Sequence, residues 1–263
     1  MLKKLIKYDL VSIFKFLLIF YSLAIVFSIL TRMFFAIEDS TMMNIIAHIC
    51  SGATISMIAN ILINNIMRLW IRFKQNLYGD ESYLTHTLPV NKNTLYLSKI
   101  LTSIITLFTS FLVIGITIFI AYYSKEFVEL IKNILLPMLN IPTNTIIRIL
   151  LIIILILFLE IINILQAGYT GIIIGHKKSQ NKVVYSVLFG FITYTFTQIF
   201  ALVIIFITAL FNKGLMDLFV TNTIIDTELL KLMLYIASII YMISILIINI
   251  LNVKLFQKGV NVD

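Results

Sequence analysis

Residues 148–175 read RILLIIILILFLEIINILQAGYTGIIIG, and this stretch decides the class of fold. Between Arg148 at its start and Gly175 at its end, the only charged side chain is Glu160. About 20 apolar residues in an α-helix are enough to cross the hydrocarbon core of a bilayer. The stretch is therefore predicted to be a membrane-spanning helix.

Other parts of the chain repeat this pattern. Hydrophobic residues make up 60% of the 263 positions, charged residues only 12%, and the mean hydropathy is +1.05. This composition excludes an ordinary soluble domain, because such a fold cannot bury so much apolar surface. The further apolar runs occupy residues 14–35, 44–67, 99–123, 183–211 and 231–253. We predict an all-α membrane protein in which residues 1–263 form a single domain of six transmembrane helices.

Basic residues are distributed unevenly between the two sides of these spans. Six spans place both termini on one side, and fourteen of the twenty Lys and Arg residues would lie on that side. These fourteen are Lys3, Lys4, Lys7, Lys15, Arg68, Arg72, Lys74, Lys92, Lys99, Lys177, Lys178, Lys182, Lys254 and Lys258. The positive-inside rule then predicts a multi-pass protein of the plasma membrane with cytosolic N- and C-termini. The net charge of +8 reflects this topology and does not indicate binding to nucleic acid.

Two segments outside the spans are amphipathic. Residues 1–13 carry apolar side chains at helical spacing beside Lys3, Lys4 and Lys7, which predicts a helix lying on lipid at the inner membrane surface. Contact of this segment with a cytosolic partner is the alternative. Residues 124–147 alternate in the same manner and are expected to lie on the outer leaflet.

The long cytosolic loop, residues 68–98, reads RLWIRFKQNLYGDESYLTHTLPVNKNTLYLS. Gly79 is expected to stop the preceding helix, and Asp80 to cap a short helix that continues to Thr87. Pro89 disfavours helical geometry at Leu88, so an extended step follows. Asn91 is expected to cap the next span, with Lys92 and Lys99 near the lipid headgroups. From these residues alone, a connecting loop and a force-transmitting helix remain equally open.

Three runs in this loop carry a resemblance: YGDESYL at 78–84, TLPV at 87–90 and LSK at 97–99. They resemble the first cytosolic loop of type-2 ABC transporter permeases, although His86, Asn91 and Asn93 depart from that pattern. The resemblance implies that residues 80–87 form a coupling helix that docks on a stand-alone ABC ATPase subunit, which would bind ATP and Mg. The coupling residues it implies are Tyr78, Asp80, Glu81, Tyr83, Leu84, Thr87, Leu88 and Pro89.

The chain carries no motif for catalysis or for a cofactor of its own. The nearest approach to a phosphate-binding loop, residues 171–179, has the wrong spacing and lies at the end of a span. The three histidines are far apart in sequence, and no metal-binding motif includes them. We therefore expect no catalytic residue, no metal and no cofactor in this chain. Gly168, Gly171 and Gly175 are interpreted as small residues that allow close helix packing.

Glu160 is the only acidic side chain deep within a predicted span. Asn163, Ala167 and Thr170 follow on the same helix face, and Gln166 is close to it. The polar side chains of other spans that could pair with this face are Asn60, Asn64, Thr193 and Thr197. Two interpretations remain open for Glu160, Asn163, Gln166, Asn60 and Asn64: a substrate path, or a polar clasp between helices.

The resemblance also implies a function. A six-helix permease is half of a transporter, so a second copy or a related permease is expected as a partner. Similar bacterial permeases serve in resistance and self-protection, which implies export of an amphipathic peptide or another membrane-active compound. The alternative is a membrane-embedded immunity, signalling or structural subunit that does not transport.

Overall fold

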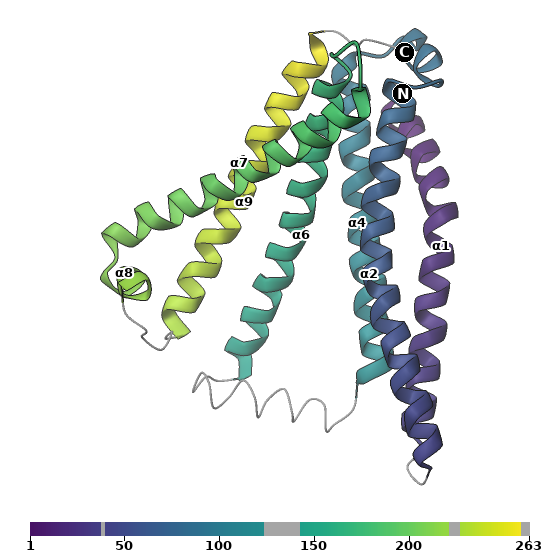
Figure 1. Cartoon of the computed structure of the whole chain (residues 1–263), viewed down its shortest axis with the longest axis vertical. Coiled ribbons are helices and arrows are strands. Elements are labelled where there is room, and N and C mark those ends of the chain that lie inside the picture. Colours follow the sequence, from purple (N-terminus) through teal and green to yellow (C-terminus); the bar gives the residue numbers. More distant parts are fainter. Residues whose placement is uncertain (38–39, 124–142, 221–226, 259–263) are drawn as a thin grey trace. The chain divides into compact units, whose positions relative to one another are not determined.

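The structure is a computed structural model, and it describes residues 1–37, 40–123, 143–220 and 227–258 (Figure 1). Helices account for 91% of these residues, and no strand occurs among them. The long helices are α1 (Leu2–Phe35), α2 (Thr41–Leu77), α4 (Lys92–Tyr122), α6 (Thr143–Gly175), α7 (Lys182–Phe211) and α9 (Thr227–Gln257). Two short helices, α3 (Ser82–Thr87) and α8 (Lys213–Val220), complete the described elements.

The prediction of an all-α fold with six potential spans is confirmed. Within the described ranges, six helices are long and apolar enough to cross a membrane. Their outward faces are rich in exposed Ile, Leu, Val and Phe, as expected where lipid replaces water as the solvent. The chain is therefore a multi-pass membrane protein. Most of the predicted outer amphipathic segment, 124–142, lies outside the described residues.

The chain divides into two compact units. The first comprises Met1–Asn76 and Tyr83–Leu130, and the second comprises Leu77–Ser82 and Ile131–Asp263. The chain thus passes into the second unit at Leu77 and returns to the first at Tyr83. Whether the two units act as the predicted single domain stays a prediction.

In the first unit, α1 packs along α4 through one buried stripe. Ile13, Leu17, Tyr21 and Ala24 are buried at steps of three and four residues, which places them on one helix face. The Tyr21 hydroxyl and Ser110 Oγ of α4 lie 2.7 Å apart. Asn65 Nδ2 of α2 also donates to Ser110 Oγ, at 2.8 Å, so one serine joins three helices.

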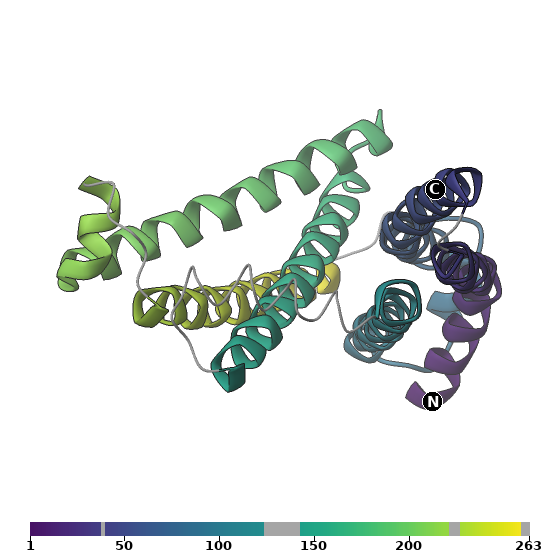
Figure 2. The same cartoon turned by 90° about the horizontal axis from the view of Figure 1, so that it is seen from below.

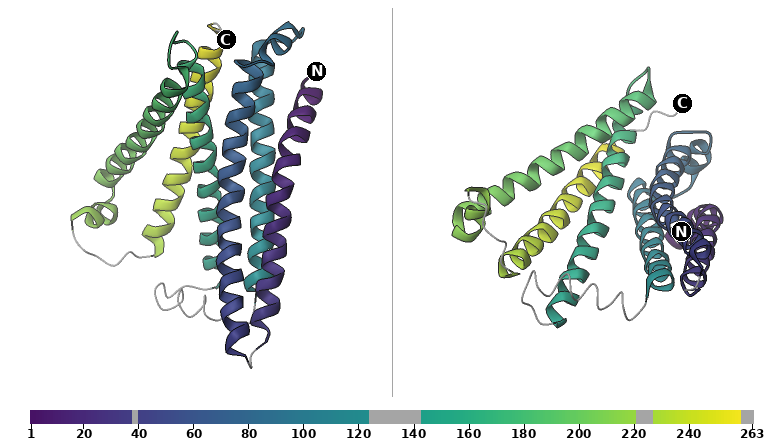
Figure 3. Two further views of the ribbon diagram at one scale, coloured as in Figure 1. Left: turned by 45° about the vertical axis from the view of Figure 1, so that its right-hand side comes forward. Right: turned by 60° about the horizontal axis from the view of Figure 1, so that its bottom comes forward.

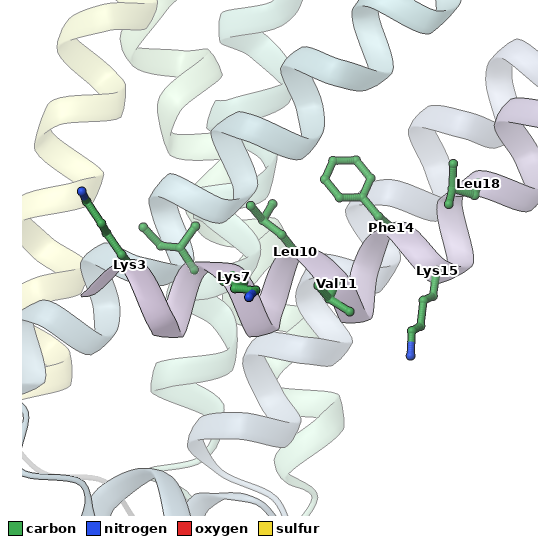
Figure 4. Close-up of a pocket in the computed structure, with 8 residues that line it drawn as sticks. Lys3, Lys7, Leu10, Val11, Phe14, Lys15 and Leu18 are labelled. Carbon is green, nitrogen blue, oxygen red and sulfur yellow. The ribbon is translucent and has the colours of Figure 1, made fainter. Parts of the chain in front are cut away.

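The N-terminal residues belong to the same long helix. Because α1 has no break at residue 13, the predicted amphipathic segment 1–13 is continuous with the first span. Its exposed face forms a shallow hollow lined by Lys3, Lys7, Phe14 and Lys15, among other α1 residues (Figure 4). The location of this face at the membrane surface stays a prediction.

In the second unit, α6 packs against both α7 and α9. α6 and α7 approach each other at the end where the chain turns from one into the other, and they diverge toward the opposite end (Figures 2 and 3). A Cβ atom added to Gly171 would lie 2.6 Å from Gly190 N, and one added to Gly175 would lie 2.6 Å from Ser186 N. The backbones are therefore too close for a larger side chain at either glycine, as the glycine pattern predicts.

Candidate functional site

The loop between α2 and α4 contains a short, well-defined helix. α2 ends at Leu77, and Ser82 N donates to Gly79 O at 2.8 Å as the chain turns into α3. α3 therefore begins two residues later than the predicted start at Asp80, and it ends at Thr87 as predicted. Asn91 occupies the N-cap position of α4, but its side chain makes no capping hydrogen bond, so that detail of the prediction is wrong.

The predicted coupling residues fall into an exposed set and a buried set. Tyr83 is 64% exposed and Leu84 74% exposed, and Leu88 is also open to the surroundings. Asp80, Glu81, Thr87 and Pro89 are exposed as well. Tyr78, in contrast, is buried. Its side chain therefore packs inside the protein and does not contribute to the exposed surface of the loop.

Tyr78 packs against the end of α6, within the second unit. The Tyr78 and His176 rings have centroids 4.6 Å apart with 33° between their planes. His176 directly follows α6, and its Nδ1 lies 2.8 Å from Ile172 O. Burial raises the pKa of the Tyr78 hydroxyl well above its usual range, so the side chain remains neutral. The start of the loop is thus packed against the end of a membrane-spanning helix.

A buried ionic cluster lies in the first unit. Lys99 Nζ of α4 donates to Asp9 Oδ2 of α1 at 2.6 Å, and Arg72 Nε of α2 donates to Asp9 Oδ1 at 3.2 Å. Lys99 Nζ also donates to Asn76 Oδ1. Lys99 is only 7% exposed and is paired inside the unit, and its predicted depth near the headgroups stays a prediction. The cluster joins α1, α2 and α4 close to the residues that flank the loop.

Glu160 lies in a second polar cluster, formed by three helices of the second unit. Its Oε1 accepts hydrogen bonds from the Tyr194 hydroxyl at 2.8 Å and from Gln198 Nε2 at 3.0 Å, both on α7. The Tyr241 hydroxyl of α9 is also close enough to interact with the carboxylate. Glu160 Oε2 is buried and has no hydrogen-bond partner among the described residues.

The polar face continues along α6 beyond Glu160. Asn163 Nδ2 donates to Thr197 Oγ1 at 3.0 Å, so Thr197 is one of the partners considered from the sequence. Asn252 Nδ2 of α9 donates to the backbone oxygen of Gln166 at 3.2 Å. Thr193 instead donates to the carbonyl of Phe189 in its own helix. α6 is thus joined to both of its neighbours by polar contacts.

Asn60 and Asn64 belong to the first unit and form hydrogen bonds along α2. Asn60 Nδ2 donates to Ser56 O, and Asn64 Nδ2 donates to Asn60 O, each at 2.9 Å. The structure therefore gives them local partners in their own helix. No group of three or more His, Cys, Asp or Glu side chains suited to a metal ion occurs within the described ranges.

Sequence reasoning missed the residues that complete both clusters. Asp9 is the one acidic residue within the lysine-rich first turns, and this signal could have marked it as a buried partner. Tyr194 and Gln198 are four residues apart in a strongly apolar helix, so they share one face. No sequence pattern around Tyr241 marks it as a partner of Glu160.

Comparison with known proteins finds no family model, no curated protein and no solved structure that matches this chain.

Proposed function

We propose that this chain is the membrane-spanning permease subunit of an ATP-driven exporter, located in the plasma membrane with both termini in the cytosol. A stand-alone ABC ATPase subunit would bind ATP and Mg and supply the energy. A second copy of the chain, or a related permease, would complete the transport path. The exported compound would be an amphipathic peptide or another membrane-active molecule.

The observation that carries this proposal is the exposed apolar surface of α3. Tyr83 and Leu84 project from a six-residue helix that lies between two much longer, membrane-compatible helices. Apolar side chains that a loop leaves exposed between two spans form a surface that favours contact with another protein. Asp80 and Glu81 beside them provide negative charge for basic groups on that partner.

Contacts on both sides of α3 support a role in transmitting force. Before α3, Tyr78 packs against His176 at the end of α6. After α3, Lys99 of α4 is ion-paired with Asp9 of α1. Movement of α3 by a bound ATPase would therefore act on α6 through an aromatic contact and on α1 through an ion pair. Packed side chains and rigid helices are the usual carriers of such coupling.

The test is copurification of the chain with the ATPase encoded beside it. Leu84→Asp should release the ATPase, because a charge without a partner at a buried contact costs about 3–5 kcal/mol. Leu84→Met is the matched control, since it keeps the apolar surface. Retention of the ATPase and of normal transport by Leu84→Asp would show that α3 is not the docking helix. If no ATPase is encoded nearby, the immunity, signalling or structural alternative is favoured.

A further inference from the structure

We propose that Glu160, Tyr194, Gln198 and Tyr241 form a binding site for the cationic amino group of an amphipathic ligand. In calling this ligand the exported compound, the inference rests on the proposed function. The binding of a cationic amino group itself is argued only from the side chains around Glu160.

The carboxylate of Glu160 has no positively charged partner within the described part of the second unit. Along α6, Arg148 precedes it by twelve residues, or about 18 Å. On α7, Lys182 is equally far from Tyr194, and Lys213 at the start of α8 follows Gln198 by fifteen residues. On α9, Lys231 and Lys254 lie about 15 Å and 20 Å from Tyr241 along the helix axis. A lysine or arginine side chain does not span these separations.

The ionic cluster of the first unit shows how this protein neutralises a structural carboxylate. Asp9 is bound by two cations, Lys99 and Arg72. Glu160, at mid-helix, is instead surrounded by neutral groups: two phenol hydroxyls and an amide. Charged groups at membrane depth are costly unless paired, and they mark ligand or ion paths. The neutral surroundings of Glu160 therefore point to a cationic ligand group as its partner.

The arrangement of donors leaves one oxygen for that ligand. Tyr194 and Gln198 both donate to Oε1, which fixes the orientation of the carboxylate. Oε2 is buried without a hydrogen-bond partner among the described residues, and the Tyr241 hydroxyl lies beside the carboxylate. An ammonium group supplies N–H donors and positive charge together, and the rings of Tyr194 and Tyr241 offer faces that attract cations. A neutral or anionic ligand would not meet these requirements.

The site lies between helices that separate along their length. Glu160, Tyr194, Gln198 and Tyr241 are all half-buried, while the Oε2 atom of Glu160 is itself buried. α7 diverges from α6 with increasing distance from their shared turn (Figure 2). The apolar helix faces around the cluster suit the hydrophobic part of an amphipathic amine.

The experiment uses two matched fluorescent probes and the purified full chain. Dansylcadaverine carries a primary ammonium group, and its N-acetyl derivative has nearly the same shape without the charge. The chain is placed in nanodiscs of zwitterionic lipid, which do not attract the ammonium by surface charge, and empty nanodiscs supply the background. Neither ATPase nor transport is needed, so failure of ATPase copurification and failure of this site are separate results.

We expect the ammonium probe to bind on the order of 10- to 100-fold more tightly than the acetylated probe. Glu160→Gln should remove this difference and leave binding of the acetylated probe unchanged. Glu228→Gln is the matched control, because Glu228 is exposed and pairs with Lys231 at 2.9 Å, and it should preserve the difference.

Equal binding of the two probes by the unmodified chain would overturn the proposal, and this comparison needs no variant to fold. Unchanged preference for the ammonium probe in a Glu160→Gln protein that elutes as a single folded species would overturn it as well. Either outcome would leave Glu160 as a structural clasp between α6, α7 and α9.

Discussion

Replacing Asp9 with asparagine tests the ionic cluster at the start of α1. The change keeps the shape of the side chain but removes its charge and one acceptor oxygen. Lys99 and Arg72 would then compete for a single amide oxygen. The Lys99 side chain is only 8% exposed, and it would keep its hydrogen bond to Asn76 but lose its ion pair with a carboxylate.

The expected loss of stability follows from the burial of the three side chains. Removing one partner of a buried ion pair costs about 3–5 kcal/mol, because the remaining charge stays buried. The Arg72 side chain is 19% exposed and keeps some access to water, so the lower end of this range applies. A change of about 3 kcal/mol corresponds to a fall in melting temperature on the order of 10 °C for a chain of this size.

The measurement is thermal unfolding of the purified chain in detergent, followed by intrinsic fluorescence. Lys7→Gln serves as the control, since Lys7 is an exposed lysine in the same helix and its loss should change stability by less than about 0.5 kcal/mol. Adding Lys99→Met to Asp9→Asn should recover part of the loss, because it removes the buried charge. A melting temperature for Asp9→Asn equal to that of Lys7→Gln would refute the reasoning.

Two further substitutions address packing in the second unit. Gly171→Leu should destabilise the α6–α7 contact by about 3 kcal/mol or more, because even a Cβ at this position would lie 2.6 Å from Gly190 N. Gly115→Ala is the control, because a Cβ at Gly115 meets open space. It should be neutral or stabilise the protein by about 0.5–1 kcal/mol. Equal melting temperatures for these two variants would contradict the close approach. Tyr78→Ala removes the ring that packs on His176 and should cost about 3–5 kcal/mol in thermal unfolding, and a cost below about 1 kcal/mol would show that this contact does not support the loop.

The helices could be predicted from sequence because their signals are local. A long apolar run such as 148–175 determines a span by length alone, and Gly79 and Pro89 indicate where the short helix between them must lie. Neither inference requires knowing which helices are neighbours. The two-residue error at the start of α3 arose because Asp80 entered the turn that Gly79 begins.

The polar clusters depend on contacts between residues distant in sequence. Asp9 and Lys99 are 90 positions apart, and a lysine near the start of a span has the same local pattern whether it faces headgroups or a buried carboxylate. Asn163 could pair with any polar side chain at a similar depth, which is why Asn60, Asn64, Thr193 and Thr197 were all candidates. Only the packing of α6 on α7 selects Thr197.

At Gly171 and Gly175 the backbones of α6 and α7 are in close contact, so a change in the angle between the two helices would pivot about this point. Glu160 lies eleven residues from Gly171, about 16 Å along the axis of α6. At that radius a relative rotation of only about 5° shifts one helix against the other by about 1.4 Å, half the length of the hydrogen bond between Glu160 and Tyr194. The carboxylate therefore sits where a small change of angle between α6 and α7 makes or breaks its contacts, while the glycine contact itself hardly moves.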